Sequence, residues 1–301
     1  MKSKIVLLIH KLIFYLKLEN IIFLFSKLLS FPIWKLLPQN IMYNPNDKLK
    51  VKKNNIIFII NRSDFTQWQI YAEYPELHYQ AFLKNNKIGN TIDVGANIGS
   101  FSLKVAKYLN EKNSEFKVYS FEPYNEIFEI LKNNIDNNPS IKEFIVNERV
   151  ALSDKINQKL NFQIIEKNLG ANFLTKVSET ESISDEKKIV LSDTLDNYCK
   201  SKNLNNITFI KIDVEGMELE VLDGGVEIIN ENKPALFIEV NETKYNEKNL
   251  SIRPYLHKFE KEKRSFFLEN ISNNPELKLI TLPDLLQKIE NSRSNFNLYI
   301  N

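Results

Sequence analysis

The chain has 301 residues, 43% hydrophobic and 11% aromatic, enough to bury the core of one large domain or two small ones. Forty Lys and Arg against 38 Asp and Glu leave a formal charge of +2, and no basic cluster indicates a nucleic-acid partner. One cysteine, Cys199, and three scattered histidines exclude an internal disulfide and the usual Cys/His metal motifs, so carboxylates are the expected acid–base groups.

The N-terminal residues 1–38 are the most apolar segment. Lys11, Lys17 and Lys27 interrupt every window that could span a membrane, and no small-residue cleavage site marks a signal peptide. The pattern predicts one or two amphipathic helices packed on the domain; attachment to an anionic membrane surface and an uncleaved anchor stay open as alternatives. We expect a cytoplasmic protein, with peripheral contact to the inner face of the membrane through residues 1–38 as the alternative.

From residue 91, apolar runs alternate with segments of helical period. We predict strands at 91–95, 116–122, 144–152, 207–214 and 234–240, and helices at 100–109, from Asn125, from a cap at Ser192 or Asp193, and from Gly216 to a glycine cap at 224–225. Short strands at 158–165 and 187–191 belong to an insertion at about 155–190, and 265–269 with 295–300 form an antiparallel pair.

This alternation predicts an α/β fold, a doubly wound and mostly parallel sheet with an antiparallel edge strand. We assign residues 1–50 to a helical extension, 51–90 to a lead-in and 91–301 to the domain itself. In such sheets ligands bind beyond the carboxyl ends of the strands, so the residues that follow the strands are the candidate site.

The first of these loops is DVGANIG, with Asp93, Gly95, Asn97 and Gly99. It lacks the third glycine of the dinucleotide fingerprint, but asparagine tolerates positive φ, so the tight turn can still form. Asp93, with Asp213 and Glu215 after the fourth strand, would repel a pyrophosphate, whereas these acids suit the sulfonium and ammonium of S-adenosylmethionine. Glu122, at the end of the second strand, would accept ribose hydroxyls of either cofactor. The charge balance favours S-adenosylmethionine over NAD.

Six segments, spread over about residues 88–245, resemble one known family. They are IDVGANIGSFSL, YSFEPYNEIFEILKNNI, RVALSD, TLDNY, FIKIDVEGMELEVLDGG and PALFIEVNE, and in this order they resemble the FkbM-type S-adenosylmethionine-dependent methyltransferases. The resemblance implies a class I methyltransferase (Rossmann-like) fold and O-methylation of a hydroxyl, with a sugar in a glycan as the expected acceptor. By position it assigns the cofactor loop to Asp93, Gly95, Asn97 and Gly99, the ribose acid to Glu122, the adenine side to Ala151 and Leu152, and the Asp-x-Glu-Gly element to Asp213 and Glu215.

Methyl transfer to an alcohol benefits from a general base. With no histidine in the motif region, Asp213 or Glu215 is the candidate; we favour Asp213, with Glu215 as its partner or as a helix-terminus acid. Glu239 is a second candidate, or a strand-end acid paired with a lysine. A catalytically silent binding module and a nicotinamide-dependent oxidoreductase are the competing functions. Nothing in the sequence calls for a metal, and the acceptor and the oligomeric state are not indicated.

Overall fold

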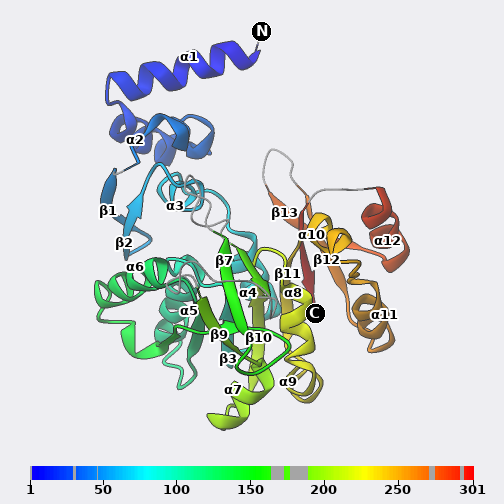
Figure 1. Ribbon diagram of the computed structural model, residues 1–301. Helices are drawn as coiled ribbons and strands as arrows, with labels where there is room; N and C mark the ends of the chain where they lie inside the picture. Colours follow the sequence, from blue (N-terminus) through cyan, green and yellow to red (C-terminus); the bar gives the residue numbers. More distant parts are fainter. Residues whose placement is uncertain are drawn as a thin grey trace. The chain divides into compact units, whose positions relative to one another are not determined.

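The structure is a computed structural model that describes residues 2–29, 32–45, 47–163, 173–176, 189–270, 275–291 and 295–301. The chain divides into two compact units, one of Met1–Pro75 with Ile165–Gly170 and one of Glu76–Ile164 with Ala171–Asn301. Figure 1 shows the helices and strands of both units. The divisions at residues 50 and 90 proposed from the sequence stay predictions.

The first unit begins with two helices, as the apolar pattern of residues 1–38 predicts. Its described elements are α1 (Lys2–Tyr15), α2 (Glu19–Leu29), η1 (Ile33–Lys35), η2 (Asn40–Met42), β1 (Lys48–Lys53), β2 (Ile56–Asn61) and α3 (Phe65–Tyr71). β1 and β2 form an antiparallel hairpin, which the sequence reading did not predict. No helix in the described part of the chain has the length and hydropathy needed to cross a bilayer.

The second unit is built on an eight-stranded sheet in the order β13-β12-β14-β11-β10-β3-β4-β5. Its strands are β3 (Asn90–Val94), β4 (Val118–Phe121), β5 (Ile145–Glu148), β10 (Ile207–Ile212), β11 (Ala235–Val240), β12 (Phe266–Asn270), β13 (Glu276–Ile280) and β14 (Phe296–Ile300). The five neighbouring strands β11, β10, β3, β4 and β5 are parallel. Beyond β11, the strands β14, β12 and β13 continue the sheet in antiparallel pairs. The predicted mostly parallel sheet with an antiparallel edge is confirmed.

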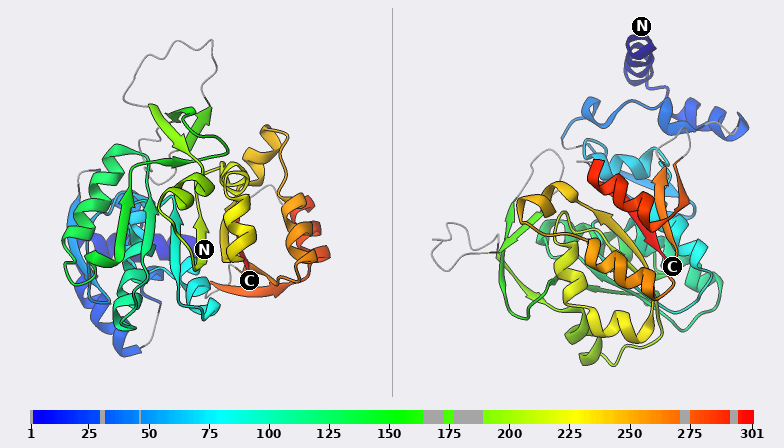
Figure 2. Two further views of the ribbon diagram at one scale, coloured as in Figure 1. Left: turned by 90° about the horizontal axis from the view of Figure 1, so that it is seen from below. Right: turned by 90° about the vertical axis from the view of Figure 1, so that its right-hand side faces the viewer.

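Helices cover both faces of this sheet (Figure 2). They are α4 (Leu77–Asn85), α5 (Ser100–Glu111), α6 (Asn125–Asp136), η3 (Lys142–Phe144), α7 (Leu195–Ser201), α8 (Glu218–Asp223), α9 (Val226–Asn232), α10 (Glu242–Glu247), α11 (Arg253–Lys261) and α12 (Leu282–Asn291). α4 and α5 pack on each other and on the central strands. Apolar side chains of α7, α8, α9, α11 and α12 share one buried core with alternate strand residues such as Ile210 and Ile212. Because strand side chains alternate, Lys211 and its register partners Asp93 and Phe237 project to the opposite face, toward α4 and α5.

Several element boundaries differ from the prediction. The single strand expected at 144–152 is two strands, β5 and β6 (Ala151–Leu152), and β6 belongs to a separate sheet with the order β6-β9-β7-β8. The other strands of that sheet are β7 (Lys159–Gln163), β8 (Phe173–Lys176) and β9 (Ile189–Asp193). Most of the predicted insertion between β7 and β9 lies outside the described residues.

Two predicted helix starts were also wrong. Ser192 and Asp193 still belong to β9, so Thr194 caps α7, its hydroxyl accepting the Asn197 amide at 3.1 Å. The helix expected from Gly216 begins at Glu218 and ends at Asp223, and a second helix, α9, follows Gly225. The three residues between the end of β10 and Gly216 are therefore loop, which frees Asp213 and Glu215 from strand alternation.

Candidate active site

The first loop of the sheet turns tightly, as its glycines and asparagine predict. Gly95, Asn97 and Gly99 have φ of 78°, 50° and 91°, so asparagine does adopt the left-handed conformation here. A Cβ on Gly95 would lie 1.8 Å from the carbonyl oxygen of Asp213. The first and fourth loops therefore touch at the carboxyl edge of the sheet, and only glycine permits that contact.

Glu122 ties the first loop to the end of β4. Its carboxylate accepts the backbone N–H of Asn97 at 2.9 Å through Oε2 and that of Tyr124 at 3.0 Å through Oε1. The side chain is 8% exposed, and this burial raises its pKa to about 7 in spite of the two hydrogen bonds.

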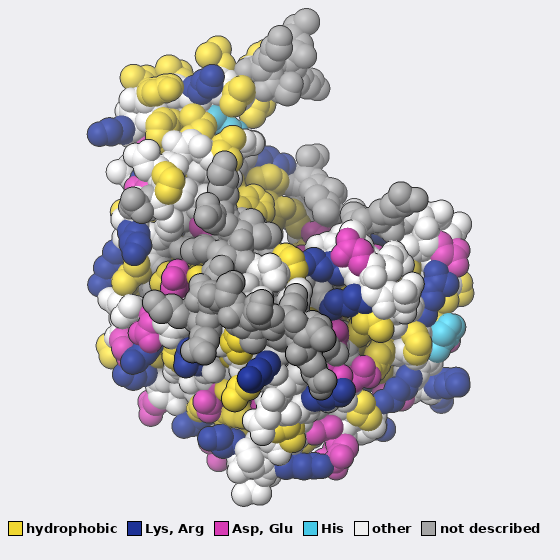
Figure 3. Space-filling view, viewed as in Figure 1, with side chains coloured by type: hydrophobic (Ala, Val, Ile, Leu, Met, Phe, Trp, Pro, Cys, Tyr) yellow, Lys and Arg dark blue, Asp and Glu magenta, His cyan; other side chains and the backbone are white. Residues whose placement is uncertain are grey.

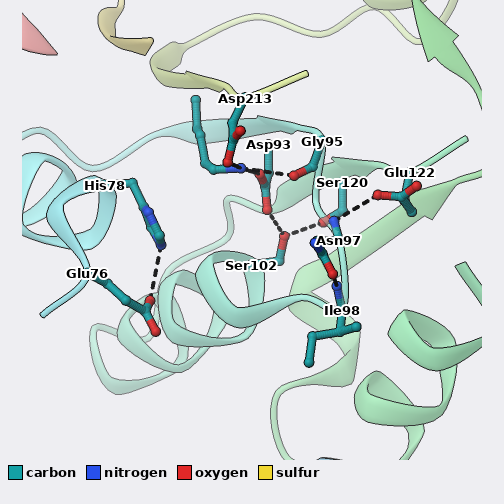
Figure 4. A network of polar contacts seen from close by, with 11 residues as sticks. Glu76, His78, Asp93, Gly95, Asn97, Ile98, Ser102, Ser120, Glu122 and Asp213 are labelled. Atoms are coloured by element: carbon teal, nitrogen blue, oxygen red, sulfur yellow. Dashed lines mark hydrogen bonds and ion pairs between the residues drawn. The ribbon is translucent and has the colours of Figure 1, made fainter. Parts of the chain in front are cut away.

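Asp93 is fully buried and faces the interior of the unit. Its Oδ2 accepts a hydrogen bond of 2.5 Å from Ser102 Oγ, and Ser102 in turn contacts Ser120 at 2.7 Å (Figure 4). Its Oδ1 lies 3.2 Å from Nζ of Lys211. From the sequence, Asp93 was expected to be an uncompensated charge beside the ligand. That expectation was wrong, because Lys211 neutralises this carboxylate within the fold.

Lys211 is the central cation of the site, and sequence reasoning missed it. Its Nζ contacts Asp93, the carbonyl of Gly95 at 2.9 Å and Oδ2 of Asp213 at 3.3 Å. Burial alone would lower the pKa of this ammonium, but the two carboxylates outweigh burial and raise it. The sequence offered one sign of it, a lysine inside the buried strand FIKIDV, but its partners depend on the pairing of β10 with β3.

Asp213 is kept ionised by its surroundings. Burial would raise its pKa, yet Lys211 outweighs burial, and a hydrogen bond from Glu239 adds to the effect, so the pKa is lowered. Glu239 shows the opposite shift: the charge of Asp213, followed by burial, raises its pKa well above the usual range. These opposite shifts make Asp213 the carboxyl group of the pair that ionises first.

Two further acids follow Asp213 on the same loop. Glu215 has φ of 54°, and burial, then the charges of Asp213 and Glu218, raise its pKa to about 8. Glu218, which sequence reasoning did not single out, is fully buried and accepts the amide of Gly216 at 2.7 Å and the hydroxyl of Tyr245 at 2.8 Å. Burial raises the pKa of Glu218 to about 7. Asp213, with a lowered pKa, is therefore surrounded by three acids with raised pKa values, Glu215, Glu218 and Glu239.

Ala151 and Leu152, the predicted adenine side, form β6 and are buried. Ala151 packs with Leu160 and Met217, and Leu152 joins the main core. Their contact with a cofactor stays a prediction.

Two polar residues at the N-terminal end of α4 were missed altogether. Glu76 and His78 lie in a segment without a motif, yet they stand beside the cluster of Asp93 and Asp213 (Figure 4). Nothing in the local sequence indicates this, because the packing of α4 on β10 and β11 brings them there.

The strand order, the antiparallel edge and the glycine turn followed by a strand-end acid define a class I methyltransferase fold. The sequence matches the family described as "Methyltransferase FkbM domain" over residues 93–266, more than half of the chain. The chain belongs to the FkbM methyltransferase family, and methyltransferases of this class use S-adenosylmethionine as the methyl donor. No curated protein matches the chain.

Several solved structures are similar to it. Methyltransferase FkbM from Methylobacillus flagellatus KT aligns with TM-score 0.46 and 16% identity, over 77% of this chain and 50% of that chain. Precorrin-6y C5,15-methyltransferase from Geobacter metallireducens GS-15 aligns with TM-score 0.35 and 8% identity, over 74% and 87%. The N-terminal domain of human METTL16 in complex with SAH aligns with TM-score 0.34 and 11% identity, over 73% and 65%. The match thus spans about half the length of the Methylobacillus protein.

Proposed function

We propose that the protein transfers a methyl group from S-adenosylmethionine to a hydroxyl of a sugar in a glycan. One observation carries the proposal: the glycine loop that starts α5 and the loop with Asp213 and Glu215 touch at the carboxyl edge of the sheet, Gly95 against Asp213. A donor held by the first loop and a hydroxyl held by the second would therefore meet at one place.

The residues of the first loop fit the methyl donor. No side chain caps α5, because Gly99 stands at its N-cap, so the N–H groups of the first turn are available to the carboxylate of S-adenosylmethionine. Each oxygen of Glu122 accepts one backbone N–H and keeps a lone pair for a ribose hydroxyl. Bound there, S-adenosylmethionine supplies an electrophilic methyl group on a sulfonium.

The ionisation of the second loop supports different roles for its two acids. Asp213, held ionised by Lys211, can accept the hydrogen bond and the proton of an acceptor hydroxyl. Glu215 keeps its proton at neutral pH, because its pKa is raised to about 8, chiefly by burial, and it therefore acts as a hydrogen-bond donor. In this proposal Asp213 is the base and Glu215 its partner.

The acid cluster also supports a polyhydroxyl acceptor. A protonated carboxyl group both donates and accepts a hydrogen bond, whereas an ionised one only accepts. Asp213, Glu215 and Glu239 combine the two states within one cluster, which matches neighbouring hydroxyls of a sugar, each of them both donor and acceptor.

Calorimetry and a glycan comparison test the proposal. The purified protein should bind S-adenosylhomocysteine and not NAD, and glycans of cells lacking the gene should lose a methyl group by mass spectrometry. NAD binding would favour the oxidoreductase. S-adenosylhomocysteine binding without any transfer to glycans would favour the silent binding module.

We also propose that α1 and α2 place the protein on an anionic membrane surface. On α1, Leu8 and Leu12 lie one turn apart and are 68% and 56% exposed. The other exposed apolar side chains of α1, α2 and the turn between them are Ile5, Val6, Leu7, Ile9, Tyr15, Leu16, Ile21, Leu24 and Phe25. Figure 3 shows hydrophobic side chains gathered on the N-terminal part of the first unit, with basic side chains among them. Exposed Lys11 and Lys17 supply charge complementary to anionic headgroups.

The length of α1 indicates how it would lie. Its 14 residues extend ~21 Å, short of the ~30 Å hydrocarbon core, so it would lie in the plane of the interface. The protein should sediment with phosphatidylcholine vesicles that contain phosphatidylglycerol, and more weakly with phosphatidylcholine alone. Leu8→Glu with Leu12→Glu should abolish sedimentation, whereas Leu279→Glu, at an equally exposed leucine on β13, should not. An equal loss of sedimentation in Leu279→Glu would contradict membrane docking. So would a dimer in light scattering that the Leu8→Glu, Leu12→Glu variant no longer forms, because the two helices would then be a dimer interface.

A further inference from the structure

Glu76 and His78 form a hydrogen-bonded pair that the proposed function does not use. Glu76 Oε2 lies 3.1 Å from His78 Nε2, while Glu76 Oε1 accepts Ser100 Oγ at 2.6 Å and lies 2.6 Å from Lys104 Nζ. The imidazole stands edge-on to Phe101 and Phe237, with ring centroids 5.3 and 5.9 Å away. The pair is therefore anchored on both sides, by a network of polar contacts and by two aromatic rings.

The chemistry of this contact fixes the tautomer of His78. Burial would raise the pKa of Glu76, but Lys104 and then His78 outweigh it and hold the pKa well below its usual range. An ionised carboxylate only accepts hydrogen bonds, so Nε2 of the ring must carry the hydrogen. In the neutral ring Nδ1 then has the free lone pair, and within the described residues no hydrogen bond occupies it.

The packing places this ring next to the acids of the fourth loop. Phe237 pairs in register with Lys211, and Glu239 follows Phe237 by two residues on β11, so its side chain projects from the same face of the sheet. Asp213 reaches this face from the loop, because its Oδ2 lies 3.3 Å from Nζ of Lys211. His78 packs on Phe237 and thus lies against the row that precedes Asp213 and Glu239. The ring is close enough to Asp213 for its imidazolium form to lower the pKa of that carboxyl group, an effect that ranks after burial, Lys211 and Glu239. Figure 4 shows His78 on the Asp213 side of Glu76.

Asp213 needs such a neighbour if it takes a proton from an alcohol. Lys211 stabilises the ionised form of Asp213, so a proton that arrives there is held weakly. The charge of Asp213 raises the pKa of Glu239 well above its usual range, so Glu239 is no base for that proton. His78, which packs on Phe237 in the same region and has a free lone pair on Nδ1, can accept that proton.

We propose that the Glu76–His78 pair is the final acceptor of the hydroxyl proton: Asp213 takes it, and one water passes it to Nδ1 of His78. The hydroxyl O–H bond breaks, its oxygen electron pair forms the new O–CH₃ bond, and the pair of the broken S–CH₃ bond stays on sulfur. The proton ends on the imidazole, and Glu76 stabilises the imidazolium as a positioning residue. This inference rests on the proposed O-methylation and deepens it.

The test compares His78→Gln with His257→Gln, a matched control because His257 is exposed on α11, away from the acids. Rates are measured with labelled S-adenosylmethionine and the glycan fraction of cells lacking the gene. His78→Gln should lower kcat by ~10²–10⁴-fold, with KM and S-adenosylhomocysteine affinity unchanged, and His257→Gln should change neither. Glu76→Gln should also lower kcat, and Glu76→Asp should restore part of it. Wild-type kcat in His78→Gln, or a fall matched by equal loss of cofactor affinity, would overturn the proposal.

A second measurement needs no acceptor. With only three histidines in the chain, nitrogen-15 NMR can follow His78 alone after single substitutions. The neutral ring should carry its hydrogen on Nε2 in the wild type and lose that preference in Glu76→Gln. A ring with its hydrogen on Nδ1 would overturn the proposal whatever the acceptor is. Failure of the proposed function shows differently, as a wild-type protein that binds no S-adenosylhomocysteine or transfers no methyl group.

Discussion

Replacing Lys211 by methionine should destabilise the second unit strongly. The ammonium has three polar contacts: Asp93 at 3.2 Å, the Gly95 carbonyl at 2.9 Å and Asp213 at 3.3 Å. Its removal leaves the wholly buried Asp93 with one serine hydroxyl and no cation. Breaking a buried ion pair by deleting one partner costs ~3–5 kcal/mol of unfolding free energy. The double variant with Asp93→Asn should recover part of that loss, because the unpaired charge is gone.

Urea unfolding followed by far-UV circular dichroism is the suitable assay. Tryptophan fluorescence would report on the wrong unit, since Trp34 and Trp68 both lie within Met1–Pro75. Lys142→Met is the matched control: Lys142 and Asp136 form an ion pair of 2.6 Å, but both are exposed, so its loss should cost at most ~1 kcal/mol. Lys211 is not the buried counter-ion if Lys211→Met lowers the free energy of unfolding by no more than Lys142→Met does. The same conclusion follows if the double variant with Asp93→Asn is less stable than Lys211→Met alone.

Three further predictions concern the same loops. Asp213→Asn should lower the transfer rate by ~10²–10⁴-fold while calorimetry shows S-adenosylmethionine affinity within about tenfold of wild type, and Glu215→Gln should retain more activity; the reverse order would exchange the two roles. Gly95→Ala should destabilise the fold by at least ~1–3 kcal/mol, since φ is 78° and the new Cβ would meet the Asp213 carbonyl at 1.8 Å, and a melting temperature equal to wild type would refute the close approach. In the folded state the pKa of Glu122, Glu215 and Glu218 is raised from 4.5 to about 7, 8 and 7, so these groups bind protons that the unfolded chain has released. Their contribution to stability is therefore full below pH 4.5 and is lost as the pH rises to about 8. Glu218→Gln should make the free energy of unfolding, measured by urea titration, depend less on pH, and an unchanged pH dependence would contradict this.

The sequence predicted well what depends on periodicity and little of what depends on pairing. Alternating apolar runs located β3, β4, β10 and β11, and Asn125 was the correct start of α6. The strand read at 144–152 failed because its apolar pattern continues through the point where the chain leaves one sheet for another. β13, with the sequence ELKLI, was missed; it lies at the edge of the sheet, and its side chains are exposed or half-buried, so no buried face marks it as a strand.

The candidate site divides in the same way. The positions of Gly95, Asn97 and Glu122 could be read from a strand–turn–helix pattern, because each acts within a few residues of its own strand end. Lys211 and His78 could not, because their partners are fixed by the register of β10 with β3 and by the packing of α4 on the sheet. Long-range contacts of this kind leave no local trace in one sequence.

The charge of the site also changes the reason for preferring a sulfonium donor. In the sequence, Asp93, Asp213 and Glu215 stand as three negative charges that would repel a pyrophosphate. In the structure Lys211 compensates Asp93 and Asp213, and Glu215 keeps its proton near neutral pH. General repulsion is therefore weak, and selectivity for the donor must come from local geometry. The start of α5, where Gly99 stands at the N-cap and no side chain caps the helix, offers its amides to the carboxylate of such a donor.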